Sequence, residues 1–265
     1  MGALVVTEGG SALTAFTPPG AGDFDLPPIF GGVTKPMILV VLSVIIIAAY
    51  FLISSRKLKI VPSKGQFAAE YIYDFARNGI AREQIGSKDF KPYIPLVLSL
   101  FSFVLVNNVF GIIPILQFPT LAHIGYPIAL SLLVVYPVYH FVGFKRHGFV
   151  GYLKHATVPP GAPLAIYFLL TPIEFLQKFV LNPITLAIRV FAAMFAGHLI
   201  ILVFTIGGEY LLTQAGGVIS KPVSVVSFLF AILMIFVEAL IQVVQAYVFA
   251  VLSANYIGAA LAEDH

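Results

Sequence analysis

The chain has 265 residues, of which 59% are hydrophobic and 10% are charged, and its formal net charge at neutral pH is +3. Soluble domains are roughly 45–50% apolar and about 25% charged, so this chain cannot cover itself with a wettable surface. The composition excludes ordinary soluble domains, disordered tails and free nucleic-acid binders, which leaves a polytopic membrane protein.

The amino-terminal residues, 1–36, are rich in Gly and Pro and carry Glu8, Asp23 and Asp25 instead of a basic start. A cleavable signal peptide is therefore not expected. Residues 37–55 are the first predicted span, because at about 1.5 Å per residue they nearly cross a hydrocarbon core of about 30 Å. The predicted organisation is an extracytoplasmic tail, 1–36, followed by a single membrane domain, 37–265.

A basic segment follows the first span. It holds eight of the fifteen Lys and Arg residues of the chain: Arg56, Lys57, Lys59, Lys64, Arg77, Arg82, Lys88 and Lys91. The positive-inside rule makes this segment cytoplasmic, so the amino terminus is expected outside and the carboxyl terminus, five spans later, in the cytoplasm. Within it, residues 63–84 place aromatic side chains at helical spacing, which fits an amphipathic surface helix and equally a solvated linker helix.

Two further spans are predicted at 93–115 and 124–144. Lys145, Arg146 and Lys154 then return the chain to the cytoplasmic side, in agreement with the number of spans. Asn107 and Asn108 lie inside the second span, where an amide must find partners within the protein. They are interpreted as hydrogen-bonding links between helices, with membership of the functional site as the alternative.

Two overlong apolar segments, 162–207 and 222–261, complete the chain. As straight helices they would measure about 69 and 60 Å, twice the hydrocarbon thickness, so each must be tilted, bent or broken. Pro172 and Pro183 are candidate break points in the first. A Gly-rich loop joins the two segments, so they are predicted to form a long, tilted antiparallel hairpin.

The first of these segments is unusually polar for a span. Arg189 shares a helical face with Lys178 and with the small residues Ala192, Ala193 and Ala196. Small residues let another helix approach closely, so Arg189 is expected to face a neighbouring helix. Lys178 is also spaced for an i,i+4 pair with Glu174.

The second overlong segment carries a polar stripe along one face, made by Glu238, Gln242, Gln245 and Tyr256. One antiparallel register places Arg189 level with Gln245 and His198 level with Glu238. A histidine beside a carboxylate can relay protons, because imidazole titrates near neutral pH. A buried hydrogen-bonded pair is the alternative, but ionisable side chains at membrane depth favour a transport role.

Arg189 keeps its proton at physiological pH and can act only as a fixed charge. At about 4 Å and an effective dielectric near 20, such a charge stabilises a facing carboxylate by about 4 kcal/mol. An acid that reaches Arg189 would therefore release its proton. No other acid of this chain is placed to do so, which points to a partner subunit.

Nucleotide and metal motifs are missing. The sequence has no GxxxxGK[ST] loop, GxGxxG, HExxH or GxSxG motif, and it has no cysteine. The six His residues show no metal-ligand spacing. We therefore expect no cofactor, no metal, no nucleic acid and no directly bound nucleotide, and hence no catalytic residue.

The arginine segment resembles a known family. Residues 188–198 read IRVFAAMFAGH and look like the arginine helix of the a-subunit family of F-type ATP synthases. Residues 107–114, NNVFGIIP, are similar to that family's Asn-x-x-Gly-x-x-Pro span, and the stretch from Glu238 through Gln245 to Tyr256 resembles its terminal helix. The resemblance covers most of the chain.

This resemblance implies a non-catalytic stator that holds two aqueous half-channels against a rotating ring of small hairpin subunits. Arg189 would keep arriving ring carboxylates charged, and Gln245 would support it. His198 and Glu238 would line proton access on the outer side. Peripheral-stalk subunits and other ATP synthase subunits are the further partners implied, in a bacterial cell membrane.

Two departures from the family pattern stand out. Well-known bacterial members have the acid on the arginine helix and the imidazole on the last helix, whereas this chain has His198 and Glu238, which keeps the same two groups in contact. Ala192 and Ala193 replace a frequent Gly-Asn pair. The coupling ion, H⁺ or Na⁺, is left open, and a self-contained proton-coupled secondary transporter is the rival interpretation.

Overall fold

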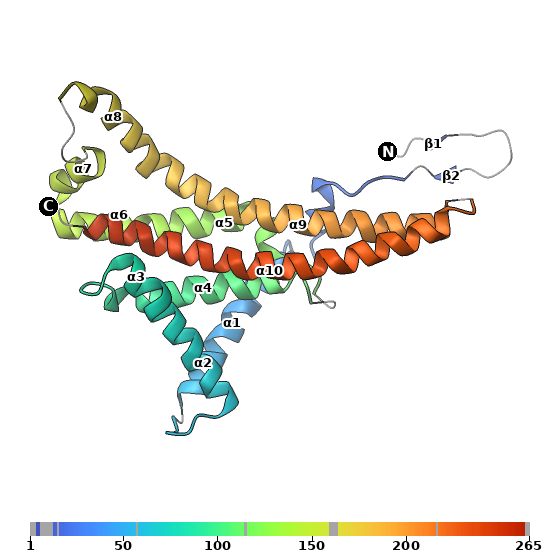
Figure 1. Ribbon diagram of the computed structural model, residues 1–265, viewed down its shortest axis with the longest axis horizontal. Coiled ribbons are helices and arrows are strands. Elements are labelled where there is room, and N and C mark those ends of the chain that lie inside the picture. Colours follow the sequence, from blue (N-terminus) through green and yellow to red (C-terminus); the bar gives the residue numbers. More distant parts are fainter. Residues whose placement is uncertain are drawn as a thin grey trace.

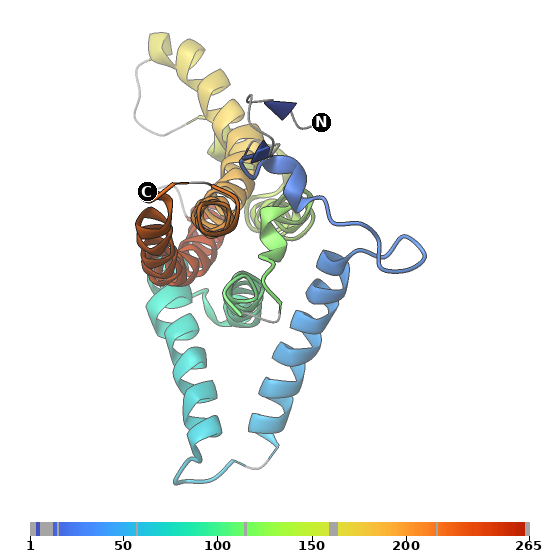
Figure 2. The same cartoon turned by 90° about the vertical axis from the view of Figure 1, so that its right-hand side faces the viewer.

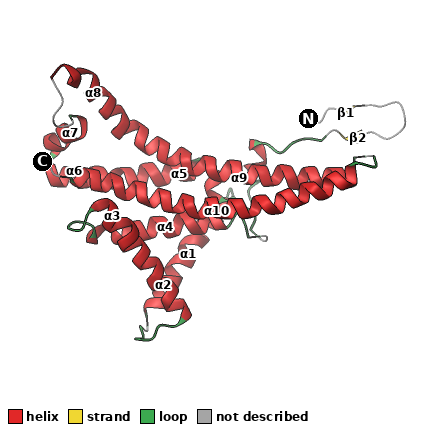
Figure 3. Cartoon of the chain, in the orientation of Figure 1, coloured by secondary structure: helices red, strands yellow, loops and turns green. Residues whose placement is uncertain are grey.

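The computed structural model describes residues 4–5, 13–14, 16–56, 58–113, 116–158, 164–215 and 217–262. Within these residues, five helical stretches are long and apolar enough to cross a membrane: Lys35–Ser55, Lys91–Val109, Gly125–His147, Tyr167–Thr213 and Ser220–Leu261. The predicted fold class, an all-α polytopic membrane protein with five long hydrophobic segments, is confirmed. Figures 1 and 3 show a long row of helices that run side by side, with α1 and α2 extending away from one side of it.

The tail before the first span contains little regular structure. Strands β1 (Leu4–Val5) and β2 (Leu13–Thr14) form one antiparallel pair, and a 3-10 turn covers Ala21–Phe24. Helix α1 (Lys35–Ser55) then begins with Pro36 in its first turn, where the missing N–H of proline costs no hydrogen bond. The tail therefore reaches α1 without helical structure longer than one turn in its described part.

The basic segment folds as one bent helical unit. Helix α2 (Lys64–Asp74) begins where the Ser63 hydroxyl accepts a hydrogen bond from the backbone N–H of Gln66, at 3.4 Å. A π-helical stretch, Phe75–Ala81, and α3 (Arg82–Ile85) continue it. Figure 2 shows α1 and α2 diverging as the two arms of a V.

The aromatic side chains of this unit do not share one environment. Phe67 and Tyr71 on α2 are exposed. Phe75, in contrast, contacts Phe101 and Tyr247, with ring centroids 5.4 and 5.7 Å apart. The carboxyl-terminal end of the unit is thus anchored on the helical core while α2 extends away from it.

The middle of the chain forms a helical hairpin. Helix α4 (Ile94–Val109) is followed by a turn and by α5 (Gly125–Ala129), a π-helical stretch (Leu130–Val135) and α6 (Tyr136–His147). Helix α4 ends six residues before the predicted boundary at 115, because the chain turns where Gly111 lies against Pro119; a Cβ on Gly111 would be 3.0 Å from the Cβ of Pro119. Helix α7 (Phe149–Thr157) then doubles back.

The first overlong segment is bent but stays helical. Helix α8 (Leu164–Leu176) passes through Pro172, a π-helical stretch covers Gln177–Leu181, and α9 (Asn182–Thr213) has Pro183 in its first turn. A proline cannot donate a hydrogen bond to the preceding turn, and a π turn widens the backbone at such a place. Figure 1 shows α8 leaving the line of α9.

Helix α10 (Ser220–Leu261) is the central helix and packs beside α9, α4 and α6. Its buried residues include Ala246, Ala250 and Ala254, a small stripe that lets neighbouring helices approach closely. The outer surfaces of the last two long segments remain uncovered, since only 17% of the apolar window of each is buried, against 44% for the stretch that contains α4. Lipid or partner subunits must cover the rest.

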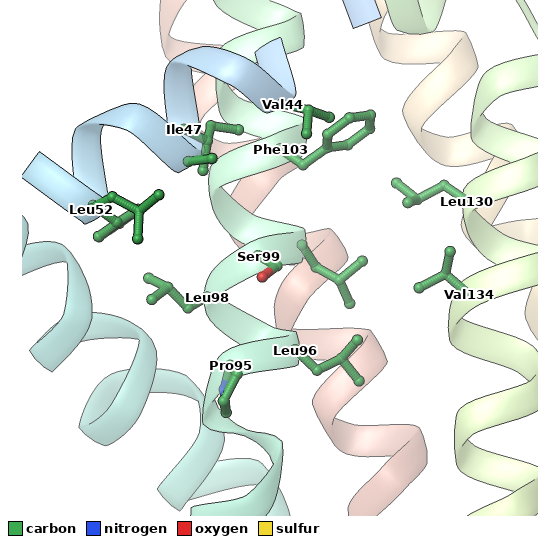
Figure 4. Close-up of a pocket in the computed structure, with 13 residues that line it drawn as sticks. Val44, Ile47, Leu52, Pro95, Leu96, Leu98, Ser99, Phe103, Leu130 and Val134 are labelled. Atoms are coloured by element: carbon green, nitrogen blue, oxygen red, sulfur yellow. The ribbon is translucent and has the colours of Figure 1, made fainter. Parts of the chain in front are cut away.

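An apolar cavity of about 470 Å³ lies between α1, α4 and the π-helical stretch Leu130–Val135. Figure 4 shows its lining, in which Ser99 is the single hydroxyl side chain. The cavity shares no residue with the polar positions predicted on α9 and α10. It therefore has no group that could take part in proton chemistry at those positions.

Candidate functional site

The register of the α9–α10 hairpin is fixed by serine hydroxyls. Ser224 donates to the carbonyl of Gly208 and Ser227 to that of Phe204, each at 2.7 Å. Further along, Gly197 lies against Glu238, because a Cβ on this glycine would be 3.4 Å from the Cγ of Glu238. Glycine thus leaves room for a glutamate between the two helices, opposite the next residue of α9, His198.

His198 and Glu238 are brought together as the antiparallel register predicts. The Nδ1 of His198 lies 3.9 Å from the Oε1 of Glu238, and the two residues are only 8% and 2% exposed. This separation is too long for a direct hydrogen bond, so the two groups are close neighbours and not a bonded pair. Gln242, one turn further along α10, donates to the same Oε1 at 3.2 Å.

A row of buried polar atoms continues from this pair along α10 to α4. Asn108 on α4 donates to the backbone carbonyl of Gln242 at 3.3 Å. Within the described structure, five buried atoms of this row have no hydrogen-bond partner: Asn108 Oδ1, His198 Nδ1, Glu238 Oε2, Gln242 Oε1 and Gln245 Nε2. Because buried polar groups are nearly always paired, this row has capacity for further hydrogen bonds inside the protein.

Asn107 belongs to a different set of contacts. Its amide nitrogen donates at 2.8 Å both to the Ser43 hydroxyl on α1 and to the Phe103 carbonyl. Its amide oxygen accepts from the Thr120 hydroxyl at 2.8 Å. The interpretation of both asparagines as links between helices agrees with their contacts, but only Asn108 also touches the row of unpaired atoms.

Arg189 lies on the outside of the hairpin. It is exposed, as are Ala192 and Ala196 on the same face, while Ala193 is half-buried. No carboxylate in the described part of the chain lies within salt-bridge distance of Arg189. Its guanidinium is therefore presented over small side chains, free to meet a group from another subunit.

The expected support of Arg189 by Gln245 is not formed as a hydrogen bond. Gln245 is buried, and its Nε2 is one of the unpaired atoms. Tyr256 lies close to Arg189 instead, and its hydroxyl contacts Thr185 on α9. Tyr256 thus connects the polar stripe of α10 to the arginine face.

Glu174 and Lys178 form the i,i+4 pair that their spacing predicts, with Nζ and Oε2 3.3 Å apart. Lys178 also donates to the carbonyl of Ala156 on α7, at 2.8 Å. Lys178 and Tyr256 line a common cavity of about 50 Å³ near the carboxyl-terminal end of α10. The Glu174–Lys178 pair therefore lies away from His198 and Glu238, toward the carboxyl-terminal end of α10.

Two groups of residues were missed in the sequence. The hydroxyl of Tyr152 is hydrogen-bonded to the Nδ1 of His140, at 2.9 Å, and the ring of Phe179 stacks on that imidazole. Burial raises the pKa of the Tyr152 hydroxyl to about 12, so this hydroxyl stays protonated at neutral pH. Phe24 of the tail covers His198. Neither contact follows from spacing, because each joins segments whose relative placement depends on tertiary packing.

No group of three or more His, Cys, Asp or Glu side chains that could hold a metal ion occurs in the part of the chain that the structure describes. The buried row contains imidazole, carboxyl and amide groups, of which the imidazole and the carboxyl can take up and release protons.

Comparisons with known proteins agree with this arrangement. Residues 37–258 match the family described as ATP synthase A chain. A protein of a Nocardioides species named ATP synthase subunit a is 44% identical over 264 residues, covering 94% of this chain and 95% of the relative. Proteins with the same name from Pseudarthrobacter chlorophenolicus and Streptomyces lividans are 46% and 41% identical, covering 94% of this chain and 94% and 89% of themselves.

Proposed function

This chain belongs to the ATP synthase A chain family and is a bacterial multi-pass component of the membrane sector of an F-type ATP synthase, and from that premise we propose that it translocates protons. It acts as the stator of the rotary device. Its two half-channels open toward a ring of small hairpin subunits, each with one carboxylate. Formation of ATP takes place on other subunits.

The observation that carries the proposal is that the ionisable side chains of the hairpin lie in two different environments. His198 and Glu238 are buried between helices, whereas Arg189 is exposed on a face of small residues. A proton from outside passes to His198 and Glu238, then along the unpaired polar row to a ring carboxylate. The carboxylate that next reaches Arg189 is held ionised, because a cation at about 4 Å stabilises it by about 4 kcal/mol.

The same charge prevents a leak between the half-channels. A proton that tried to pass directly would have to cross the field of Arg189, which keeps its own proton at physiological pH. Each proton that moves down about 100 mV supplies about 2.3 kcal/mol. Several protons must therefore turn the ring for each ATP formed elsewhere in the complex.

Orientation and further partners complete the proposal. The described tail that packs on α9 and the turn between α9 and α10 lie toward one end of the long row of helices, and the end of α10 lies at the other, near α6 and α7 (Figure 1). With the basic segment in the cytoplasm, the tail faces the outside of the cell membrane. Peripheral-stalk subunits cover exposed apolar surface that the ring does not.

A self-contained secondary transporter would need a substrate cavity at Arg189. The cavity of about 470 Å³ is apolar and does not include Arg189. We therefore prefer the stator, and uptake of a solute by this chain alone in liposomes would reverse that preference.

The test is ATP-driven acidification of membrane vesicles that contain the assembled complex. We expect Arg189→Ala to reduce pumping to background while the ring still co-purifies, because the fixed charge is worth roughly a thousandfold in the ionisation equilibrium of the facing acid. Arg82→Ala, which removes an exposed arginine of α3, is the matched control. Normal pumping by Arg189→Ala would refute the proposal.

A further inference from the structure

The tail before the first span covers the buried imidazole of His198. Phe24 is only 4% exposed, although it belongs to the tail and not to a span. Its ring makes an edge contact with His198, with centroids 5.9 Å apart, and a tilted contact with Phe195 at 4.8 Å. Figures 1 and 2 show this part of the tail running beside α9. The ring of Phe24 thus covers the His198 side chain on the side that faces the tail.

A titratable pair lies on the other side of Phe24. His123, in the turn between α4 and α5, has its Nε2 3.4 Å from the Oδ1 of Asp25 and 3.2 Å from the carbonyl of Phe24. The side chains of His123 and Asp25 are 37% and 76% exposed, so water reaches both. The same short piece of tail therefore touches one exposed histidine and one buried histidine.

We propose that His123 and Asp25 form the outermost proton-exchange site of this chain, and that Phe24 is the apolar barrier between this site and His198. The inference rests on the proposed function, since it concerns how protons reach His198. An unprotonated ring nitrogen of His123 takes a proton from bulk water and releases it to a water molecule beneath Phe24. Only nitrogen–hydrogen and oxygen–hydrogen bonds are exchanged, and no other reactant is needed.

The surroundings of His123 support this assignment. Besides Asp25, the aromatic rings of Tyr126 and Phe118 face it, with centroids 6.4 and 6.5 Å away. An exposed carboxylate beside the imidazole raises the local proton concentration. Asp23, two residues earlier, instead accepts a hydrogen bond from the backbone N–H of Gly20 at 2.7 Å and so belongs to the fold of the tail.

The first experiment measures proton uptake from the outer side by the membrane sector in vesicles stripped of the catalytic sector. We expect the double variant Asp25→Asn, His123→Gln to slow uptake at alkaline external pH by about tenfold, the lower end of electrostatic effects on association rates. Gln at position 123 can still reach the carbonyl of Phe24. Asp23→Asn is the matched control, with the same charge change and no contact to His123, and it should leave the rate unchanged.

The second experiment measures access to position 198. The chain has no cysteine, so His198→Cys gives a single reporter in the assembled complex. We expect Phe24→Ala to accelerate its labelling by a small water-soluble thiol reagent from the outer side by at least about tenfold, because thiol reactions depend on access. Phe16→Ala is the matched control, because Phe16 also holds the tail on α9, through Tyr210 at 5.4 Å, without touching His198.

The outcomes separate the two proposals. If Glu238→Gln conducts protons normally, the proposed function fails. If Glu238→Gln blocks conduction but the Asp25, His123 and Phe24 variants behave like their controls, only the outer exchange site is overturned. Equal labelling rates with Phe24→Ala and Phe16→Ala would refute Phe24 as the barrier, since detachment of the tail alone would then explain both.

Discussion

Asn107 and Asn108 are neighbours on α4 and have the same side chain, yet they belong to two different polar regions. The region around Asn107 joins α1, α4 and the turn at Thr120, and both ends of its amide are paired. The region around Asn108 joins α4, α9 and α10, and it contains five buried atoms with no hydrogen-bond partner within the described structure. Burial alone therefore does not distinguish the two regions.

The difference separates a fully paired polar cluster from a row with unused hydrogen-bonding capacity. A fully paired amide contributes its hydrogen bonds to stability. Buried donors and acceptors without a partner carry a free-energy cost of about 1–3 kcal/mol each, and the row around Asn108 is the one that we propose carries protons. Mutations can break this comparison in three places.

The largest expected effect is on the unpaired region. Glu238→Gln preserves the acceptor for Gln242 and removes the proton-binding group, so passive proton conduction should fall by at least about a hundredfold, a typical loss for a positioned acid or base. The assembled complex should be recovered in normal amount. Unaltered conduction at every pH would remove Glu238 from the path.

The next effect is on stability. Asn107→Ala removes the hydrogen bonds of the amide group to the hydroxyls of Ser43 and Thr120, so the free energy of unfolding should fall by about 1–3 kcal/mol. Thermal unfolding of the complex in detergent would show a lower midpoint. Conduction per assembled complex should stay unchanged, and a selective loss of conduction would place Asn107 in the path instead.

The smallest effect is that of the same substitution one residue later. Asn108→Ala removes one long hydrogen bond, 3.3 Å, to the Gln242 carbonyl. Conduction should fall about two- to tenfold, corresponding to about 0.5–1.5 kcal/mol, and the unfolding midpoint should drop less than with Asn107→Ala. Equal effects of the two substitutions on both measurements would erase the distinction between the regions.

Much of the fold follows from the sequence, because apolar runs that are long enough to cross a membrane identify the spans. The register of the hairpin was predictable because one offset brings the polar levels of both helices together, and His198 does lie opposite Glu238. The exposure of Arg189 was also predictable, because the small residues Ala192 and Ala196 share its helical face. These features depend on helical periodicity alone.

What could not be predicted depends on contacts between segments that lack periodicity. Phe24 belongs to an irregular tail, and nothing in its spacing indicates contact with His198 on α9. The end of α4 at Val109 depends on how Gly111 meets Pro119, a tertiary contact. The unpaired state of Gln245, which was expected to support Arg189, depends on side-chain orientation within a register that was itself correct.

The π-helical stretch Gln177–Leu181 has a consequence for the angular phase of the hairpin. One residue inserted into a helix turns everything before it by about 100° relative to everything after it. Glu174 lies before this stretch, its partner Lys178 lies within it, and Arg189 lies after it. The orientation of Glu174 around the helix axis relative to Arg189 therefore depends on one inserted residue, and removing one residue from the stretch would keep the helix continuous and rotate Glu174 by about 100° relative to the arginine face.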